Sequence, residues 1–455
     1  MYRFLHRHLL LPAFESGVKR RNTMRYWREL ERSQWFSPQQ LEKLQLRNLR
    51  RLLRHAFDHC PYYRQAWSRA GLDPVDVKKF DDFRSWPTTD RDTIRQQRLQ
   101  MRAQVPGMQL YAKATGGSSG VPVQFDLNVD SDARRTAAWH RGYGWAGAEP
   151  GTKQFYLWGV SLGERPRWRV WKDALYHRFH RRLYANSFEL SEAEVPRLLE
   201  RLNRYRPDAI VAYTNPLYYF AKSLDERGLT PYSPRSIVVG AEKLHPFQRT
   251  LIEKVFRAPV FESYGSREVM LIGSECDRHE GLHLTSEVVL VEILDDDGTP
   301  TLPGEEGNVV ITDLHNFGMP FIRYANGDRA LAGWGTCSCG RGLPLLRRVV
   351  GRRLDVLHTP DGRRLPGEFF PHLLKDFPEV QRFQVIQDRA DSVELRVVLK
   401  DGWKANHRDV VQQEASKLLG PQVCLKIAAV DEIPLTPAGK LRVVVNRTAE
   451  YAAAD

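Results

Sequence analysis

The middle of the sequence alternates between short apolar runs and longer amphipathic stretches. The runs at 154–160, 209–213 and 236–239 have the length of strands and carry mostly apolar side chains, which is typical of strands covered on both faces. Residues 191–205 are predicted to be helical, and a second helix is expected after Thr214–Pro216, running to Arg227. This alternation predicts an α/β domain with its loops at the strand ends, where ligands gather.

The flanking segments predict further elements. Helices are expected at 24–58, where Ser37–Pro38 begins a second helical segment, and at 130–145. Between 281 and 329 the sequence has the pattern of successive β-strands. Beyond residue 351 the sequence predicts strands near 381–386 and 393–399, a helix near 406–419 and a final strand.

A chain of 455 residues is too long for one compact core. We expect an N-terminal helical region packed on the large domain (1–110), a core domain (111–350) and a small α+β domain (351–455).

The chain carries 68 Lys and Arg residues against 55 Asp and Glu residues, a net charge of +13. This excess would suit nucleic acid, a membrane surface or an anionic substrate such as a nucleotide. The sequence contains no zinc-finger pair, RNA-binding signature or basic helical repeat, so no nucleic-acid partner is expected. Five cysteines, an odd number, argue against a disulfide framework and for a reducing compartment.

The amino terminus combines short apolar runs with Arg3, His6, Arg7 and His8. These runs are too interrupted for a signal peptide, and no run in the sequence is long enough for a transmembrane segment. We therefore expect a cytoplasmic protein. A basic amphipathic contact with a membrane or a partner stays open, as does a homodimer.

A loop rich in glycine and hydroxyl residues precedes a β-prone run. Its residues are Thr115, Gly116, Gly117, Ser118, Ser119 and Gly120. Such a backbone can approach an anion closely, and its amides and hydroxyls can donate to phosphate oxygens. The spacing fits neither the P-loop nor the dinucleotide fingerprint. A linker or turn is the alternative.

Four later segments also concentrate chemically active residues. They are Phe261–Glu268, Arg323–Asp328, Gly351–Asp355 and Pro434–Arg442. In this order and at these separations, together with the glycine loop, they resemble the adenylate-forming superfamily. Within it the chain is most similar to phenylacetate–coenzyme A ligases and their capsular-polysaccharide-biosynthesis relatives. The motifs that carry this resemblance are 115–120, 240–242, Glu275–Cys276, Gly281–His283, Cys337–Arg341 and His59–Tyr63.

The resemblance implies a large ATP-binding domain of several subdomains and a small mobile C-terminal domain. It implies that a carboxylate attacks the α-phosphate of ATP and releases pyrophosphate, and that a nucleophile, usually the coenzyme A thiol, then displaces AMP. The cofactors implied are ATP, Mg²⁺ and coenzyme A.

Roles for individual residues follow from the resemblance. The loop 115–120 would hold the β- and γ-phosphates. Glu268 is a carboxylate of the kind that Mg²⁺ prefers, and Lys440 would bridge the carboxylate and the α-phosphate, where charge builds up during transfer. These two are the expected catalytic residues.

The nucleoside would be held by a second group of residues. Tyr264, followed by Gly265, would stack on adenine, with Gly240, Ala241 and Glu242 beside the same base. Asp328 and Arg352 would address the ribose hydroxyls.

The sequence departs from the family pattern at three places. Val121 stands where the loop usually continues with lysine, and Leu354 replaces the first acid of the boundary motif, which leaves Asp355. That acid is the usual hinge, so the hinge position is open. The loop 358–364 also differs from that of coenzyme A ligases, so an amine or hydroxyl acceptor stays open, as does a non-catalytic ATP/AMP-binding protein.

Cys276, His283, Cys337 and Cys339 form two close pairs from distant segments, which is how a chain builds a tetrahedral metal site. Many relatives carry this set, so the resemblance favours structural zinc. His279 could replace His283, and free thiols are the alternative. Cys60 and Cys424 are expected to be buried small hydrophobes.

The acid itself cannot be read from the sequence. Trp158, Tyr213, Tyr218 and Tyr219 lie on stretches that would line its pocket and favour an aromatic or apolar acid, although core packing explains them equally well.

Overall fold

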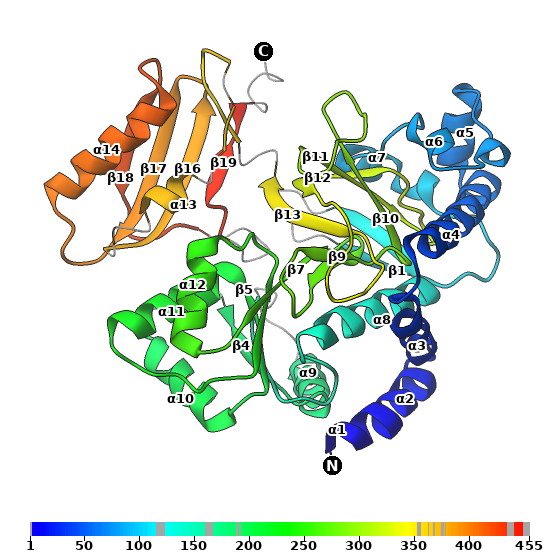
Figure 1. Ribbon diagram of the computed structural model, residues 1–455, viewed down its shortest axis with the longest axis horizontal. Coiled ribbons are helices and arrows are strands. Elements are labelled where there is room, and N and C mark those ends of the chain that lie inside the picture. Colours follow the sequence, from blue (N-terminus) through cyan, green and yellow to red (C-terminus); the bar gives the residue numbers. More distant parts are fainter. Residues whose placement is uncertain are drawn as a thin grey trace. The chain divides into compact units, whose positions relative to one another are not determined.

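The structure, a computed structural model, describes residues 2–114, 123–159, 167–187, 190, 193–352, 356–362, 364–366, 369–374, 377, 379–434 and 441–448. The chain divides into two compact units, Met1–Val350 and Gly351–Asp455. Figure 1 shows the ribbon of the chain and labels many of its helices and strands.

The first unit is built on an 11-stranded mixed sheet. Its strand order is β10-β11-β12-β13-β9-β8-β7-β6-β5-β3-β4. The parallel part comprises β3 (Gln154–Trp158), β4 (Arg182–Asn186), β5 (Ala209–Tyr213), β6 (Ser236–Gly240) and β7 (Val260–Ser266). The other strands are β8 (Met270–Glu275), β9 (Leu282–Leu284), β10 (Val289–Leu294), β11 (Glu306–Asp313), β12 (Tyr324–Ala332) and β13 (Leu345–Arg352). A separate hairpin pairs β1 (Leu110–Ala114) with β2 (Gln124–Asn128).

Helices surround these sheets. Before the first hairpin they are α1 (Tyr2–Leu5), η1 (His6–Leu10), α2 (Leu11–Ala13), η2 (Phe14–Val18), α3 (Thr23–Ser33), α4 (Pro38–His59), α5 (Pro61–Arg69), η3 (Pro74–Asp76), α6 (Asp81–Arg84) and α7 (Arg91–Met101). After it come α8 (Val129–Trp145), α9 (Arg167–Phe179), α10 (Val195–Tyr205), α11 (Thr214–Glu226) and α12 (Pro246–Phe256). In the described part of the chain, no helix has the length and apolar character needed to cross a membrane.

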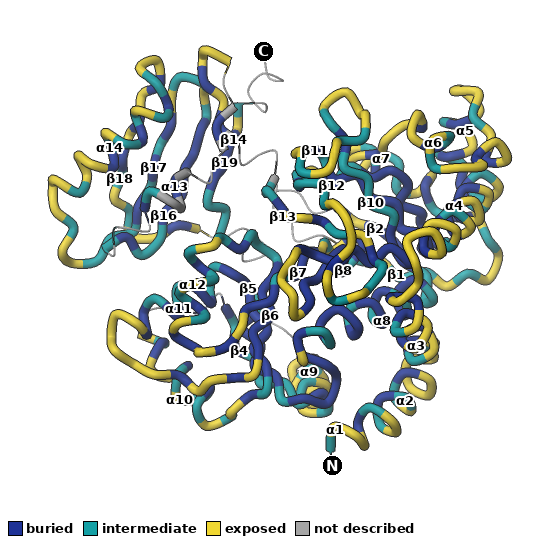
Figure 2. Tube along the Cα trace, in the orientation of Figure 1, coloured by how far each residue is buried: buried dark blue, intermediate teal, exposed yellow. Residues whose placement is uncertain are grey.

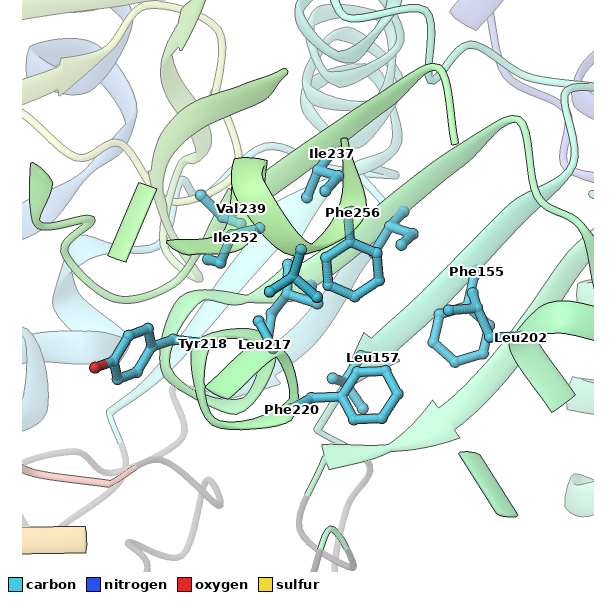
Figure 3. Close-up of a cluster of buried hydrophobic side chains, with 14 of the residues drawn as sticks. Phe155, Leu157, Leu202, Leu217, Tyr218, Phe220, Ile237, Val239, Ile252 and Phe256 are labelled. Atoms are coloured by element: carbon cyan, nitrogen blue, oxygen red, sulfur yellow. The ribbon is translucent and has the colours of Figure 1, made fainter. Parts of the chain in front are cut away.

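The register of the parallel strands gives the sheet two apolar faces. Phe155, Ile210, Ile237 and Val260 are partners across four strands and belong to one buried cluster with α10, α11 and α12. Figure 3 shows Phe155 and Ile237 among the side chains of this cluster.

The next row of the same strands faces the other way because side chains alternate along a strand. Tyr156, Val211, Val238 and Phe261 lie in a second buried cluster, with Tyr143 of α8. Helices therefore cover both faces of the parallel part, and the predicted α/β class is confirmed.

The second unit pairs a four-stranded sheet with a helix. The sheet has the order β18-β17-β16-β19. Its elements are β14 (Val356–His358), β15 (Arg364–Pro366), α13 (Phe369–Leu374), β16 (Val380–Arg389), β17 (Ser392–Leu399), α14 (Ala405–Leu419), β18 (Cys424–Ala429) and β19 (Val444–Asn446). The predicted strands and helix are confirmed, and the expected final strand corresponds to two strands, β18 and β19.

Most helix boundaries agree with the sequence. The segment beginning at Ser37–Pro38 is α4, and the Ser37 side chain accepts a hydrogen bond from the backbone of Gln40 in a capping box. The expectation for Cys424 is wrong. Its side chain is exposed, because residues of β18 alternate between the core and solvent and Cys424 falls on the solvent side. Cys60 is buried, as expected.

The helix at residues 2–18 was not anticipated. The backbone at Leu5, Leu10, Ala13 and Phe14 stays in the right-handed helical region, so α1, η1, α2 and η2 form one continuous helix, here called the N-terminal helix. His6 packs its ring 5.4 Å from that of His180, measured between ring centroids.

A cluster of buried histidines lies beneath the N-terminal helix. His6, His140 and His180 are each at most 3% exposed, and ring nitrogens of all three lack a hydrogen-bond partner. Burial and the nearby Arg182 lower the pKa of His6 to about 4, of His140 to about 3 and of His180 to about 2. Arg181 adds to this effect at His6. All three histidines are therefore neutral in the folded protein at pH 7.

This cluster predicts a loss of stability in mild acid. The unfolded chain takes up protons at these histidines below about pH 6.5 whereas the folded chain does not, so the free energy of unfolding falls as the pH drops from 7 to 5. The contribution at pH 5 is about 2 kcal/mol for each histidine. Denaturant unfolding at several pH values should show a smaller pH dependence in His180→Gln, whereas His8→Gln, at an exposed position, should behave as wild type. Equal slopes in all three proteins would contradict the role of the cluster.

Candidate active site

Three polar side chains lie on one face of β12. Tyr324, Asn326 and Asp328 alternate along the strand and are therefore directed to the same side. Asn326 Nδ2 donates to the Tyr264 hydroxyl at 2.9 Å and to Asp328 Oδ2 at 2.7 Å. The Tyr264 hydroxyl donates to the same Asp328 oxygen at 2.8 Å. Tyr264 and Asp328, which the sequence assigned to one nucleoside, are thus joined in one hydrogen-bonded network.

Glu268 is held next to this network. It is 2% exposed, and its Oε1 accepts from the Tyr324 hydroxyl at 2.9 Å. The Arg91 guanidinium donates to the same hydroxyl at 3.4 Å. Burial lowers the pKa of Arg91, but Tyr324, Glu268 and Asp328 more than offset it and the pKa is raised. One cation therefore interacts with both carboxylates.

Glu242 lies where β6 ends and α11 begins. Its Oε2 accepts from the backbone N–H of Asn215 at 2.8 Å, in the first turn of α11. Its backbone carbonyl accepts from the Thr214 hydroxyl at 3.0 Å. A carboxylate is favoured at a helix amino terminus because the peptide dipoles point their positive ends there. Gly240 and Glu242 thus sit at the carboxyl end of a parallel strand, where α/β proteins bind ligands.

Packing explains two of the glycines assigned to the nucleotide. A Cβ atom on Gly265 would lie 2.0 Å from the carbonyl oxygen of Met270, and one on Gly240 would lie 2.6 Å from Ser263 Oγ. Ser263 Oγ in turn donates to the Val239 carbonyl at 2.9 Å. Both glycines allow β6, β7 and β8 to approach one another closely. This close packing sets the positions of the strands that carry the site residues.

Three residues beside the site have left-handed backbones. They are Ala241 (φ 67°), Met270 (φ 69°) and Arg323 (φ 46°). For residues with a Cβ this conformation costs on the order of 1–2 kcal/mol, so the surrounding structure must hold the backbone at these three positions.

Aromatic residues lie at the ends of two further parallel strands. The rings of Trp158 at the end of β3 and Tyr213 at the end of β5 lie 4.3 Å apart. Tyr218 belongs to the buried cluster formed with α10, α11 and α12, and Tyr219 packs against it. Trp158 and Tyr213 are therefore the pair at the strand ends, whereas Tyr218 and Tyr219 lie on α11.

The four predicted metal ligands meet. Cys276, His283, Cys337 and Cys339 place one ligand atom each within 4.8 Å of all the others. Cys276 Sγ lies 3.6 Å from Cys337 Sγ, and Cys339 Sγ lies 3.4 Å from His283 Nε2. A zinc tetrahedron with Zn–S bonds of about 2.3 Å has edges of about 3.8 Å, so the geometry fits.

The alternative ligand His279 faces elsewhere. Its Nδ1 lies 3.2 Å from Glu275 Oε2, beside the Arg249 pair of that carboxylate. The cluster therefore contains His283 and excludes His279.

Several predicted residues lie outside the described residues or lack a described side chain. The loop Thr115–Gly120, with Gly116, Gly117, Ser118, Ser119 and Val121, lies outside, as do Leu354, Asp355 and Lys440. Arg352 ends β13, but its side chain is not described. Their roles stay predictions.

Sequence reasoning missed the partners that fix the predicted residues. Tyr324 and Asn326 could have been found from the alternation along 324–328, which places them on one face with Asp328. Arg91 and Thr89 carry no such signal, because only the fold brings them to β12. Thr89 forms a parallel bridge with Tyr324 and accepts from the backbone of Ala325 at 2.8 Å.

A solved structure of 2-hydroxyisobutyryl-CoA ligase, in the postadenylation state with 2-HIB-AMP, superposes on this chain with a TM-score of 0.71. It is 20% identical and covers 91% of each chain. The fold is that of the adenylate-forming ligases. In this fold the network around Tyr264, Glu268 and Asp328 lies in the large N-terminal unit.

Sequence comparisons agree with the fold. The chain is 25% identical to the phenylacetate-coenzyme A ligase of Thermus thermophilus over 90% of this chain and 97% of the relative. It is 23% identical to protein CapK of Staphylococcus aureus over 74% of both. Residues 357–447 match the CapK C-terminal domain family. The predicted resemblance to phenylacetate–coenzyme A ligases and CapK-like proteins is confirmed.

The hydrogen-bonded network predicts a measurable contribution to stability. Asn326→Ala removes the donor shared by Tyr264 and Asp328, and we expect a loss of roughly 1–3 kcal/mol in the free energy of unfolding, because buried polar groups are left with fewer partners. Asn308→Ala is the matched control, since Asn308 donates to Asp295 and Asp296 from a half-buried position. Denaturant titration measures both, and an equal loss in the two variants would argue against a special role for the network.

Proposed function

We propose that this protein activates a carboxylic acid with ATP and transfers the acyl group to coenzyme A. The observation that carries the proposal is the similarity to a phenylacetate-coenzyme A ligase along 90% of this chain and 97% of the relative. The adenylate-forming ligase fold, the buried carboxylate Glu268 and the half-buried carboxylate Asp328 support it.

The proposed chemistry has two steps. An oxygen of the substrate carboxylate bonds to the α-phosphorus of ATP, and the bond to pyrophosphate breaks. The thiol sulfur of coenzyme A then bonds to the acyl carbon, its proton is lost, and AMP leaves. Both steps proceed through oxyanions, which fixed cations and hydrogen-bond donors stabilise.

The chain's own residues have distinct tasks in this proposal. Asp328, held by Asn326 and Tyr264, accepts hydrogen bonds from the ribose hydroxyls, and the Tyr264 ring stacks on adenine. The loop 115–120 donates to the terminal phosphates. Lys440 holds the reacting carboxylate and the α-phosphate together.

The buried carboxylate Glu268 suits Mg²⁺, whose preferred ligands are hard oxygens. The ion would neutralise phosphate charge when ATP is bound. The hydrogen bond from Tyr324 fixes the orientation of this carboxylate.

A second acceptor class is supported by the C-terminal unit. Residues 357–447 match the CapK C-terminal domain, and the loop 358–364 departs from the coenzyme A ligase pattern. An amine or hydroxyl acceptor is therefore the alternative to the thiol. We place the enzyme in the cytoplasm, where ATP and coenzyme A are available.

The ring pair at the strand ends supports an aromatic or apolar acid. Trp158 and Tyr213 lie 4.3 Å apart at the carboxyl ends of β3 and β5. Burial, with a smaller effect of Glu242, raises the pKa of Tyr213 to about 12, so its phenol stays neutral. Neutral rings favour an uncharged acyl chain.

We also infer that the cluster Cys276, His283, Cys337 and Cys339 holds a structural zinc ion. All four protein ligands would be used, which is typical of structural rather than catalytic zinc. His283 lies on β9, and the two other segments of the cluster follow β8 and precede β13. The ion would therefore tie a loop to the antiparallel part of the sheet.

The central test is pyrophosphate release from ATP with a library of carboxylic acids. Lys440→Ala should lower this rate by ~10²–10³-fold, because the charge that stabilises the transfer is gone. Lys426→Ala is the control, since it removes an exposed lysine of the same unit. Wild-type rates in Lys440→Ala would remove Lys440 from the mechanism.

The same screen separates the acceptors. Product analysis with coenzyme A, an amine or a polyol present identifies the acceptor class. Failure of wild-type protein to release pyrophosphate with any acid would favour the non-catalytic ATP/AMP-binding alternative.

Zinc has an independent test. Metal analysis of freshly reduced protein should give about one zinc per chain, and Cys339→Ser should lose the ion and unfold at a lower temperature. Cys424→Ser should keep both properties, because Cys424 is exposed and outside the cluster. Zinc-free wild-type protein with unchanged stability would refute the site.

A further inference from the structure

Two neighbouring helices of the first unit present an unusual surface. The N-terminal helix (residues 2–18) contacts α9 through the Tyr2 hydroxyl, which donates to the Phe179 carbonyl at 2.8 Å. The Phe14 ring lies 5.1 Å from that of Phe179 and 6.2 Å from that of Tyr176. The two helices therefore pack against each other, and their exposed faces are here together called the two-helix surface.

Exposed apolar side chains are concentrated on it. Among the described residues, nine of the eighteen exposed large apolar side chains lie on these two helices, which hold 17 and 13 residues of the 455. They are Phe4, Leu5, Leu9, Val18, Trp168, Val170, Trp171, Leu175 and Tyr176. Figure 2 marks much of α9 as exposed. Such a concentration is typical of a contact surface rather than of scattered surface residues.

Three exposed apolar side chains of α9 lie on one face of the helix. Trp168, Trp171 and Leu175 follow one another at intervals of three and four residues and share one face of the helix. They are 61%, 79% and 68% exposed. The face of a helix that carries two tryptophans and a leucine is apolar enough to enter another apolar phase.

The N-terminal helix is fixed with its apolar residues outward. Arg7 Nη1 pairs with Glu149 at 2.6 Å, Arg3 pairs with the same carboxylate, and His6 is buried. These contacts hold the inner face, so Phe4, at 70% exposure, and Leu9, at 61%, remain on the outer face.

The charge of the two-helix surface is positive. Lys19 and Arg20 are exposed directly after the N-terminal helix, and the acid of α9, Asp173, is half-buried. The acid Glu15 is buried and accepts from Thr23 at 2.5 Å, whereas Lys172 and Arg178 are exposed beside the tryptophans.

We propose that the two-helix surface docks on an anionic phospholipid bilayer. Apolar side chains enter the boundary between headgroups and acyl chains, tryptophans settle at that level, and lysines and arginines contact the anionic headgroups. The helices lie in the plane of the bilayer surface, which requires no spanning segment.

A second copy of the chain fits this surface less well. A two-fold interface places the same patch against itself, so the basic residues of both copies would face one another. Like charges brought together in this way cost several kcal/mol. A bilayer of anionic lipid supplies the opposite charge instead.

Vesicle sedimentation of the full-length protein tests the proposal. Vesicles of phosphatidylglycerol mixed with phosphatidylcholine should sediment the protein, whereas vesicles of phosphatidylcholine alone should bind at least about tenfold less. About 0.5 M NaCl should weaken binding to the anionic vesicles, because salt screens charge.

Three variants separate the contributions. Trp168→Ser/Trp171→Ser/Leu175→Ser removes the apolar face of α9, Phe4→Ser/Leu9→Ser removes that of the N-terminal helix, and Lys172→Glu/Arg178→Glu reverses charge. Each should lower partitioning at least about tenfold. Leu99→Ser/Leu302→Ser is the matched control, because these leucines are 68% and 67% exposed on other elements. Thermal melting confirms that each variant folds.

Other outcomes would overturn the proposal. Equal sedimentation with both vesicle types, or unchanged sedimentation of all three variants, would exclude the two-helix surface as a lipid contact. A wild-type dimer in light scattering that these variants convert to monomers would assign the surface to a second copy of the chain.

Discussion

The parallel pairing of β3, β5, β6 and β7 is the constraint on which the rest of the first unit depends. Its register produces one apolar row on each face, headed by Phe155 and by Tyr156. Both rows must be covered, so helices pack on both sides and the connections emerge at the strand ends. A slip of one residue would exchange the two rows and expose the wrong partners to each set of helices.

The candidate active site lies where this packing leaves room for polar side chains. Packing has already fixed the faces of the sheet, so polar groups can gather only at its end and along the neighbouring antiparallel strands. There Glu242 is held by the start of α11, and Asp328 by Tyr264 and Asn326. Both side chains are half-buried, and a carboxylate that is partly removed from water is costly unless it is hydrogen-bonded. The network therefore both stabilises the acids and holds them in a defined orientation.

The sequence predicted the elements whose pattern is local. The runs at 209–213 and 236–239, the cap at Ser37 and the helix at 130–145 all carry periodic or capping signals within a few residues. The cysteine and histidine set was also predicted, because its pairs were conspicuous in spacing.

What sequence reasoning missed depends on long-range contacts. Arg91 reaches Tyr324 across 233 positions, and no periodicity links them. Cys424 was misjudged because exposure on a strand depends on which side faces the core, and cysteine alone does not indicate that side. The helix at 2–18 was missed because its inner face is set by Glu149 and the histidine cluster rather than by its own apolar period.

The bridge between Thr89 and Tyr324 has a consequence for how such a protein can evolve. Backbone hydrogen bonds join the segment before α7 directly to the strand that carries Asn326 and Asp328. A recombination event that exchanged the first ninety residues for those of a distant relative would replace one edge of the site along with them. The amino-terminal region and the active-site strand must therefore stay compatible with each other for the site to keep its shape.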